Sequence, residues 1–160
     1  MKNFIMSFRY NKQSDSDFGM EYKDGKYISE KDGSEWVKCK LYDFGWGKEN
    51  GFYKIPLGTF HELIALVLSD EDKEDSYGAA AIIATNYQME LKIFLQNLMT
   101  QKINISTKEK LNEIFFLDES YNKTFEIGMT FSQIEKEYND WKQIAKFYSP
   151  KKRRFLKFLK

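Results

Sequence analysis

The residues that could support chemistry in this chain are few, and most of them are carboxylates. The chain has one histidine, His61, and one cysteine, Cys39, so a Cys–His nucleophile requires those two to meet in space. Cys39 alternates in phase with Val37 and Leu41, which is the pattern of a small core residue in a strand. His61 falls in the first turn of an expected helix, where a solvent-facing or capping role is expected. We therefore predict no catalytic residues and a protein that is not an enzyme.

One enzymatic alternative stays open, a hydrolase that uses a paired aspartate and glutamate. With 24 acidic residues, neighbouring carboxylates are expected by number alone.

A zinc site is not expected, because one histidine and one cysteine do not make a zinc ligand set. The glycines of residues 44–51 lie between two expected strands instead of before a helix, so they do not predict a phosphate-binding loop. We predict no metal and no cofactor.

The densest group of carboxylates lies in the segment SDEDKEDS, residues 69–76. These acids could collect a hard cation, but the segment lacks the glycine position and the terminal glutamate spacing of a calcium loop. The alternative is a solvated linker whose acids favour the positive end of the following helix. Trp46, between two glycines, is also open to two interpretations: an exposed aromatic anchor for a partner, or a side chain folded back on the core.

The C-terminal segment KKRRFLKFLK, residues 151–160, has the opposite charge. The other 150 residues, which we call the body, carry 19 basic and 24 acidic residues. The body is therefore net acidic, although the net charge of the whole chain is +1. In a helix the four apolar residues of the tail would form one stripe. Three uses stay open: docking on the chain's own acidic body, contact with anionic lipid or nucleic acid, and contact with a partner protein. The basic residues of this tail are Lys151, Lys152, Arg153, Arg154, Lys157 and Lys160.

The elements that must position these residues begin with strands. Apolar and polar residues alternate in residues 3–10 and 35–44, which predicts two strands. Between them, Asp24-Gly25 separates two short aromatic segments, as in a hairpin whose tight turn needs positive φ. Asp32-Gly33 predicts a second turn. A further short strand is expected at residues 52–55, before Pro56.

Helices are expected from Thr59 onward. Thr59 with Glu62 predicts a capping box, and residues 106 and 132 are predicted to open two later helices in the same way. The small residues 78–81 would let a helix over residues 77–87 approach a neighbour closely, and residues 88–99 form an amphipathic helix. In the last helix one face is predicted to be buried: Ile134, Tyr138, Trp141, Ala145 and Tyr148.

Strands grouped before helices predict an α+β fold, with an N-terminal antiparallel β-meander followed by four to five packed α-helices. A length of 160 residues fits a single α+β domain, predicted at residues 1–150, with a basic amphipathic tail or short helix at residues 151–160.

No apolar run approaches the roughly 20 residues that span a bilayer. The N-terminus lacks a signal-peptide cleavage site, and one cysteine fits a reducing compartment. We predict a cytoplasmic protein.

The segment EDSYGAAAIIATNY, from Glu74 to Tyr87, resembles a segment of small bacterial proteins encoded in toxin–immunity loci of low-GC Gram-positive bacteria. The resemblance implies a non-enzymatic protein-binding module, an immunity protein that binds and neutralises a cognate toxin domain. An acidic surface would suit a basic, nuclease-type toxin. The alternative is a peripheral membrane- or nucleic-acid-associated protein that acts through its tail. On the immunity reading, the partner-binding residues are Trp46, Asp70, Glu71, Asp72, Glu74 and Asp75.

Overall fold

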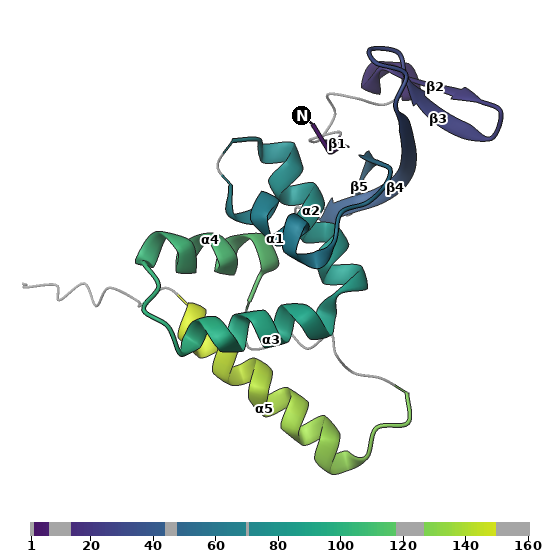
Figure 1. Cartoon of the computed structure of the whole chain (residues 1–160). Helices are drawn as coiled ribbons and strands as arrows, with labels where there is room; N and C mark the ends of the chain where they lie inside the picture. Colours follow the sequence, from purple (N-terminus) through teal and green to yellow (C-terminus); the bar gives the residue numbers. More distant parts are fainter. Residues whose placement is uncertain (1, 7–13, 44–47, 70, 118–126, 150–160) are drawn as a thin grey trace, which may run out of the picture. The chain divides into compact units, whose positions relative to one another are not determined.

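The strands come first in the chain and the α-helices follow (Figure 1). The computed structural model describes residues 2–6, 14–43, 48–69, 71–117 and 127–149. The strands are β1 (Phe4–Met6), β2 (Met20–Lys23), β3 (Lys26–Ser29), β4 (Glu35–Asp43) and β5 (Lys48–Lys54), with a short 3-10 helix, η1 (Asp15–Phe18), before β2. The α-helices are α1 (Phe60–Leu68), α2 (Lys73–Asn86), α3 (Gln88–Met99), α4 (Ile105–Phe115) and α5 (Phe131–Tyr148). The predicted α+β fold, with strands before helices, is confirmed.

The chain divides into two compact units at Leu91, inside α3. Unit 1, residues 1–91, holds the sheet, η1, α1 and α2. Unit 2, residues 92–160, holds α4, α5 and most of α3. The assignment of residues 1–150 to a single domain stays a prediction.

The sheet of unit 1 is antiparallel, with the strand order β1-β5-β4-β3-β2. Strands β2 to β5 form the predicted meander, and β1 joins its far side by pairing with β5. Asp24 and Gly25 connect β2 to β3 with φ values of 50° and 82°. Both positive values are those that a tight hairpin turn requires, so the predicted hairpin is confirmed.

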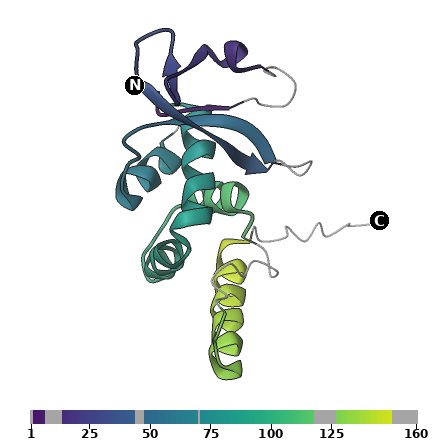
Figure 2. The ribbon, with the colours of Figure 1, turned by 90° about the vertical axis from the view of Figure 1, so that its right-hand side faces the viewer.

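Each face of the sheet is covered by a different element. On one face, β1 and β4 contribute the buried side chains of Phe4, Met6 and Leu41, and α2 packs against both strands. On the other face, Phe18 of η1 joins a buried cluster with Met20, Trp36 and Phe52. Figure 2 shows α2 (teal) on one side of β4 and β5 and η1 (purple) on the other. The sheet therefore has apolar contacts on both faces.

Helix α1 begins at the predicted capping box. The backbone N–H of Thr59 donates to the Glu62 carboxylate at 2.7 Å, and the Thr59 hydroxyl accepts from the N–H of Glu62 at 3.4 Å. The Thr59 hydroxyl also donates to the Glu62 carboxylate at 2.8 Å. The pKa of Glu62 is lowered by the bond from the Thr59 N–H and then by the bond from the Thr59 hydroxyl. The helix buries Leu63, Ile64 and Val67 and packs against α2.

Helix α2 begins at Lys73, four residues before the predicted start at residue 77. The reason is Asp72, whose carboxylate accepts from the N–H of Asp75 at 3.0 Å and caps the helix. The predicted close approach at residue 78 is confirmed. A Cβ added to Gly78 would overlap the ring of Phe4, so only glycine lets α2 lie this near to β1.

Unit 2 contains α4, α5 and the part of α3 that follows Leu91. The Tyr148 hydroxyl donates to the backbone carbonyl of Leu95 at 2.9 Å, which ties the end of α5 to α3. Burial raises the pKa of this phenol. Helix α4 packs against α5, and the Lys108 ammonium lies 3.4 Å from the centre of the Phe147 ring. Among the described residues, unit 2 thus has both apolar and polar contacts between its helices.

Two predicted helix starts were wrong, and so was one residue, Tyr138, of the predicted buried face of α5. Asn104 caps α4 in place of Ser106, because its side chain accepts from the N–H of residue 107 at 2.7 Å. Thr130 caps α5 in place of Ser132, with residue 133 completing the capping box. On α5, Tyr138 is 47% exposed, and Glu137 takes its place on the buried face.

Candidate functional site

The first turn of α2 holds strand β1 through the carboxylate of Asp75. One oxygen of Asp75 accepts from the backbone N–H groups of Asn3 and Phe4 at 2.8 and 2.7 Å. The other oxygen accepts from the side-chain amide of Asn3 at 2.9 Å. Asp75 is only 5% exposed, so these bonds satisfy a buried charge.

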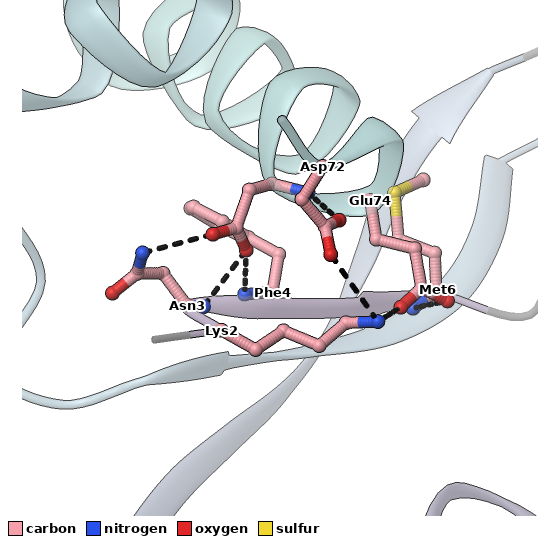
Figure 3. Close-up of polar contacts among 7 residues, drawn as sticks. Lys2, Asn3, Phe4, Met6, Asp72 and Glu74 are labelled. Carbon is pink, nitrogen blue, oxygen red and sulfur yellow. Dashed lines mark hydrogen bonds and ion pairs between the residues drawn. The ribbon is translucent and has the colours of Figure 1, made fainter. Parts of the chain in front are cut away.

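Glu74 makes the second connection to β1. Its Oε1 accepts from the N–H of Met6 at 3.3 Å, and its Oε2 pairs with the ammonium of Lys2. The Lys2 ammonium also lies 3.8 Å from a carboxylate oxygen of Asp72 (Figure 3). Desolvation lowers the pKa of Lys2, but the hydrogen bond to Glu74 and the nearby carboxylates outweigh it, and the net pKa is raised.

These contacts cover an edge of the sheet. In an edge strand every second N–H points away from the neighbouring strand and needs another acceptor. In β1 the N–H groups of Phe4 and Met6 donate to Asp75 and Glu74. The positive end of the α2 dipole favours the same two carboxylates. The acids that begin α2 therefore bind the backbone of β1.

Some of these residues also line a concave surface of unit 1, which we call the acidic depression. Its volume is about 470 Å³. It lies where the start of β1, the end of α1 and the start of α2 meet, and three of its residues are acidic against one lysine. The residues that line it are Lys2, Asn3, Leu66, Ser69, Glu71, Asp72 and Asp75.

A second concave surface, the apolar depression, adjoins the first and has a volume of about 360 Å³. Most of its residues are apolar, and Asn3 and Leu66 belong to both depressions. The residues that line it are Asn3, Phe4, Lys54, Pro56, Leu57, Gly58, Glu62, Leu63, Ala65 and Leu66. We refer to the acidic and the apolar depression together as the groove of unit 1.

The predicted partner-binding residues do not share one environment. Glu71 is exposed and Asp72 is half-buried, and both line the acidic depression. Glu74 and Asp75 are buried and bind β1, so their main contacts are internal. The remaining two predicted residues, Trp46 and Asp70, lie outside the described residues.

Lys2, Asn3 and Leu66 are among the members of this groove that sequence reasoning did not find. Lys2 and Asn3 lie about 70 positions before the acids that they contact, and nothing local in the sequence links the two segments. Leu66 falls inside the α1 pattern HELIALVL, but outside the buried set of α1. Leu66 is half-buried beside three buried residues of α1. This position could be predicted only from the exact phase of the helix.

The two candidate nucleophilic groups lie in different settings. Cys39 is half-buried in β4, and burial raises the pKa of its thiol to about 11. A thiol with this pKa is protonated at neutral pH and is a poor nucleophile. His61 is exposed in the first turn of α1, where its ring packs edge-to-face on Phe60 at 5.7 Å between ring centres.

A buried ionic group in unit 2 involves Lys92, which is 5% exposed. Its ammonium lies 2.6 Å from a carboxylate oxygen of Glu137 and 2.8 Å from one of Asp140. Desolvation lowers the pKa of Lys92, but the hydrogen bonds to Asp140 and Glu137 outweigh it, and the net pKa is raised. A lysine held in its charged form is not a nucleophile. The contacts of Lys92 with Glu137 and Asp140 instead join α3 to α5.

Metal ligands and membrane spans were also sought in the described part of the chain. There, no three side chains of histidine, cysteine, aspartate or glutamate are grouped so that they could hold a metal ion. Within the same residues, none of the helices is both long and apolar enough to cross a bilayer. The basic tail, residues 151–160, lies outside the described residues, so its electrostatic role stays a prediction.

Comparisons with protein-family models, with curated proteins and with solved structures find no match to this chain.

Proposed function

We propose that this chain is a non-enzymatic, cytoplasmic protein-binding module that holds a basic partner on the acidic depression of unit 1. The observation that carries the proposal is the acidic depression itself, which presents Glu71 and Asp72 on a concave surface of about 470 Å³. Opposite charges on two surfaces speed their encounter and disfavour wrong partners. A concave surface adds shape to that selectivity.

The more specific form of this proposal is an immunity protein that neutralises a cognate toxin domain. It is supported by the resemblance of the segment from Glu74 to Tyr87 to immunity-locus proteins, and by the suitability of an acidic surface for a basic nuclease-type toxin. The segment includes the first turn of α2, next to the acidic depression. In this form, binding blocks the partner and involves no reaction on the chain.

The test has two stages, beginning with affinity purification of partners on the full-length chain from a lysate of the source cell. The purified partner is then titrated against the wild type and the variant Glu71→Lys. Glu71 is exposed, so its replacement leaves the fold intact. We expect about tenfold weaker binding by the variant, and a wild-type affinity that falls as salt rises.

The matched control is Glu30→Lys, a charge reversal at another exposed glutamate of unit 1 that lines neither depression. It should change the affinity by less than about twofold. If Glu30→Lys and Glu71→Lys weaken binding equally, the effect is one of net charge and the proposed site is wrong. A screen that returns no protein partner would reject the function.

A further inference from the structure

We propose that the groove of unit 1 binds an extended segment of the partner that carries a basic residue beside an aliphatic one. The basic group would lie in the acidic depression and the aliphatic group in the apolar depression. This inference deepens the proposed function and rests on it, because it names the part of a protein partner that unit 1 recognises.

The acidic depression already holds an ammonium group, that of the chain's own Lys2. Its contact with Asp72, which also lines the depression, shows that a primary amine fits beside this carboxylate. Glu71, which is exposed at the same depression, leaves the carboxylates in excess over the ammonium. A second cation from a partner is therefore favoured there, whereas the phosphates of nucleic acid or of anionic lipid are repelled.

The apolar depression has the size and lining for aliphatic side chains. Its volume of about 360 Å³ is at the lower end of the range of small binding sites, and its lining includes Leu57, Ala65 and Leu66. Removing an aliphatic group from water against these side chains is favourable in proportion to the area buried. The charged residues of this depression are already engaged: Lys54 pairs with Asp32, and Glu62 caps α1.

The two depressions share Asn3 and Leu66, and this sharing decides the spacing of the ligand. Because the same two residues line both depressions, we expect a group bound in one to lie near a group bound in the other. The two recognised residues must therefore be neighbours, or nearly so, in an extended segment. Each contact alone is weak, and together they give a selectivity that a flat acidic surface does not have.

The experiment is a titration of the isotope-labelled full-length chain with three acetylated, amidated hexapeptides, followed by two-dimensional NMR. The peptides alternate lysine with leucine, lysine with serine, and glutamate with leucine. We expect the lysine–leucine peptide to shift the amide signals of Asn3, Leu66 and Glu71. The lysine–serine peptide should bind at least about tenfold more weakly, and the glutamate–leucine peptide should cause no shifts at these residues.

Two variants on the same helix provide the control. Leu66→Ser changes a residue of both depressions, whereas Leu68→Ser changes a 38% exposed residue that belongs to neither. The first should weaken the lysine–leucine peptide at least about fivefold and the second less than twofold. A thermal unfolding curve for each variant establishes that it is folded at the temperature of the titration.

Equal binding of the lysine–serine and lysine–leucine peptides, or shifts confined to other residues, would overturn the inference. So would a purified partner whose affinity falls with Glu71→Lys but not with Leu66→Ser, although the proposed function would then stand. Peptide binding at the groove together with a partner screen that returns nothing would support the ligand preference of the groove but reject the function, and with it the claim that the segment belongs to a protein partner.

Discussion

The contacts between α2 and β1 make a specific prediction for Asp75. Replacement by alanine removes the acceptor of three hydrogen bonds, from the backbone N–H groups of Asn3 and Phe4 and from the Asn3 amide. Hydrogen bonds to a charged group are worth about 1.5–3 kcal/mol each, so an upper bound is about 4.5–9 kcal/mol. Because Asn3 is half-buried, water can replace Asp75 as the acceptor of its two hydrogen bonds and recover most of their free energy.

The buried N–H of Phe4 has no such replacement, and leaving it without an acceptor costs about 1–3 kcal/mol. We therefore expect Asp75→Ala to lower the free energy of unfolding by about 2–4 kcal/mol. Asp75→Asn, which keeps one acceptor oxygen, should lose about half as much. The exposed neighbour Glu71, changed to alanine, should stay within about 0.5 kcal/mol of the wild type.

The assay is urea-induced unfolding followed by circular dichroism, combined with hydrogen exchange of the β1 amides. In Asp75→Ala the amides of Phe4 and Met6 should exchange faster than those of β4, because β1 is released before the rest of the sheet. The reasoning is refuted if Asp75→Ala unfolds within 0.5 kcal/mol of the wild type, or if the β1 amides keep their protection.

Three further predictions concern other contacts. Gly78→Ala should lower the free energy of unfolding by about 1–3 kcal/mol in a thermal melt, since its Cβ meets the Phe4 ring; a variant as stable as the wild type would contradict this packing. Lys92→Met should lower the free energy of unfolding by about 3–5 kcal/mol in a urea titration, because the buried carboxylate of Glu137 loses its counter-charge. Adding Glu137→Gln should restore part of that stability, and no recovery would count against the ion pair. At pH 8, Cys39 of the folded chain should react with iodoacetamide about a hundredfold more slowly than Cys39 of the urea-unfolded chain, as followed by mass spectrometry. The rate in the folded chain should rise as the pH approaches 11. Equal rates in the folded and unfolded chains would contradict the raised pKa.

Features set by neighbouring residues could be predicted from the sequence. The hairpin at Asp24-Gly25 and the capping box at Thr59 and Glu62 each depend on two to four adjacent residues, and both are confirmed. The α+β class follows from the change of hydrophobic period along the chain. In these cases local preference and the final fold agree, so short-range reasoning is sufficient.

Errors occurred where the sequence offers nearly equal local choices. Around the start of α5, both Thr130 and Ser132 are good caps, and the structure uses the earlier one. On the same helix, a phase shift of one residue exchanges Tyr138 for Glu137 on the buried face. Glu137 is tolerated there because Lys92, 45 residues earlier, supplies its counter-charge.

The groove depends on contacts between distant segments, which explains why it could be predicted only in part. The acidic segment was recognised, but the burial of Asp75 depends on Asn3, 72 residues away. One sequence carries no signal for such a pair. The charge of the surface was therefore predictable, whereas its concave shape and the role of Leu66 were not.

The account's central claim is that a protein partner binds in the groove of unit 1, and site-directed photo-cross-linking tests it most directly. A photoreactive amino acid is placed at Leu66, which lines both depressions, and in a second protein at Leu68, which lines neither. After irradiation in the lysate, the account predicts a cross-link from position 66 but not from position 68. Mass spectrometry should map that link to a partner segment with a basic residue next to an aliphatic one. Cross-links of equal yield from both positions, or a partner that is captured but never linked at position 66, would contradict it.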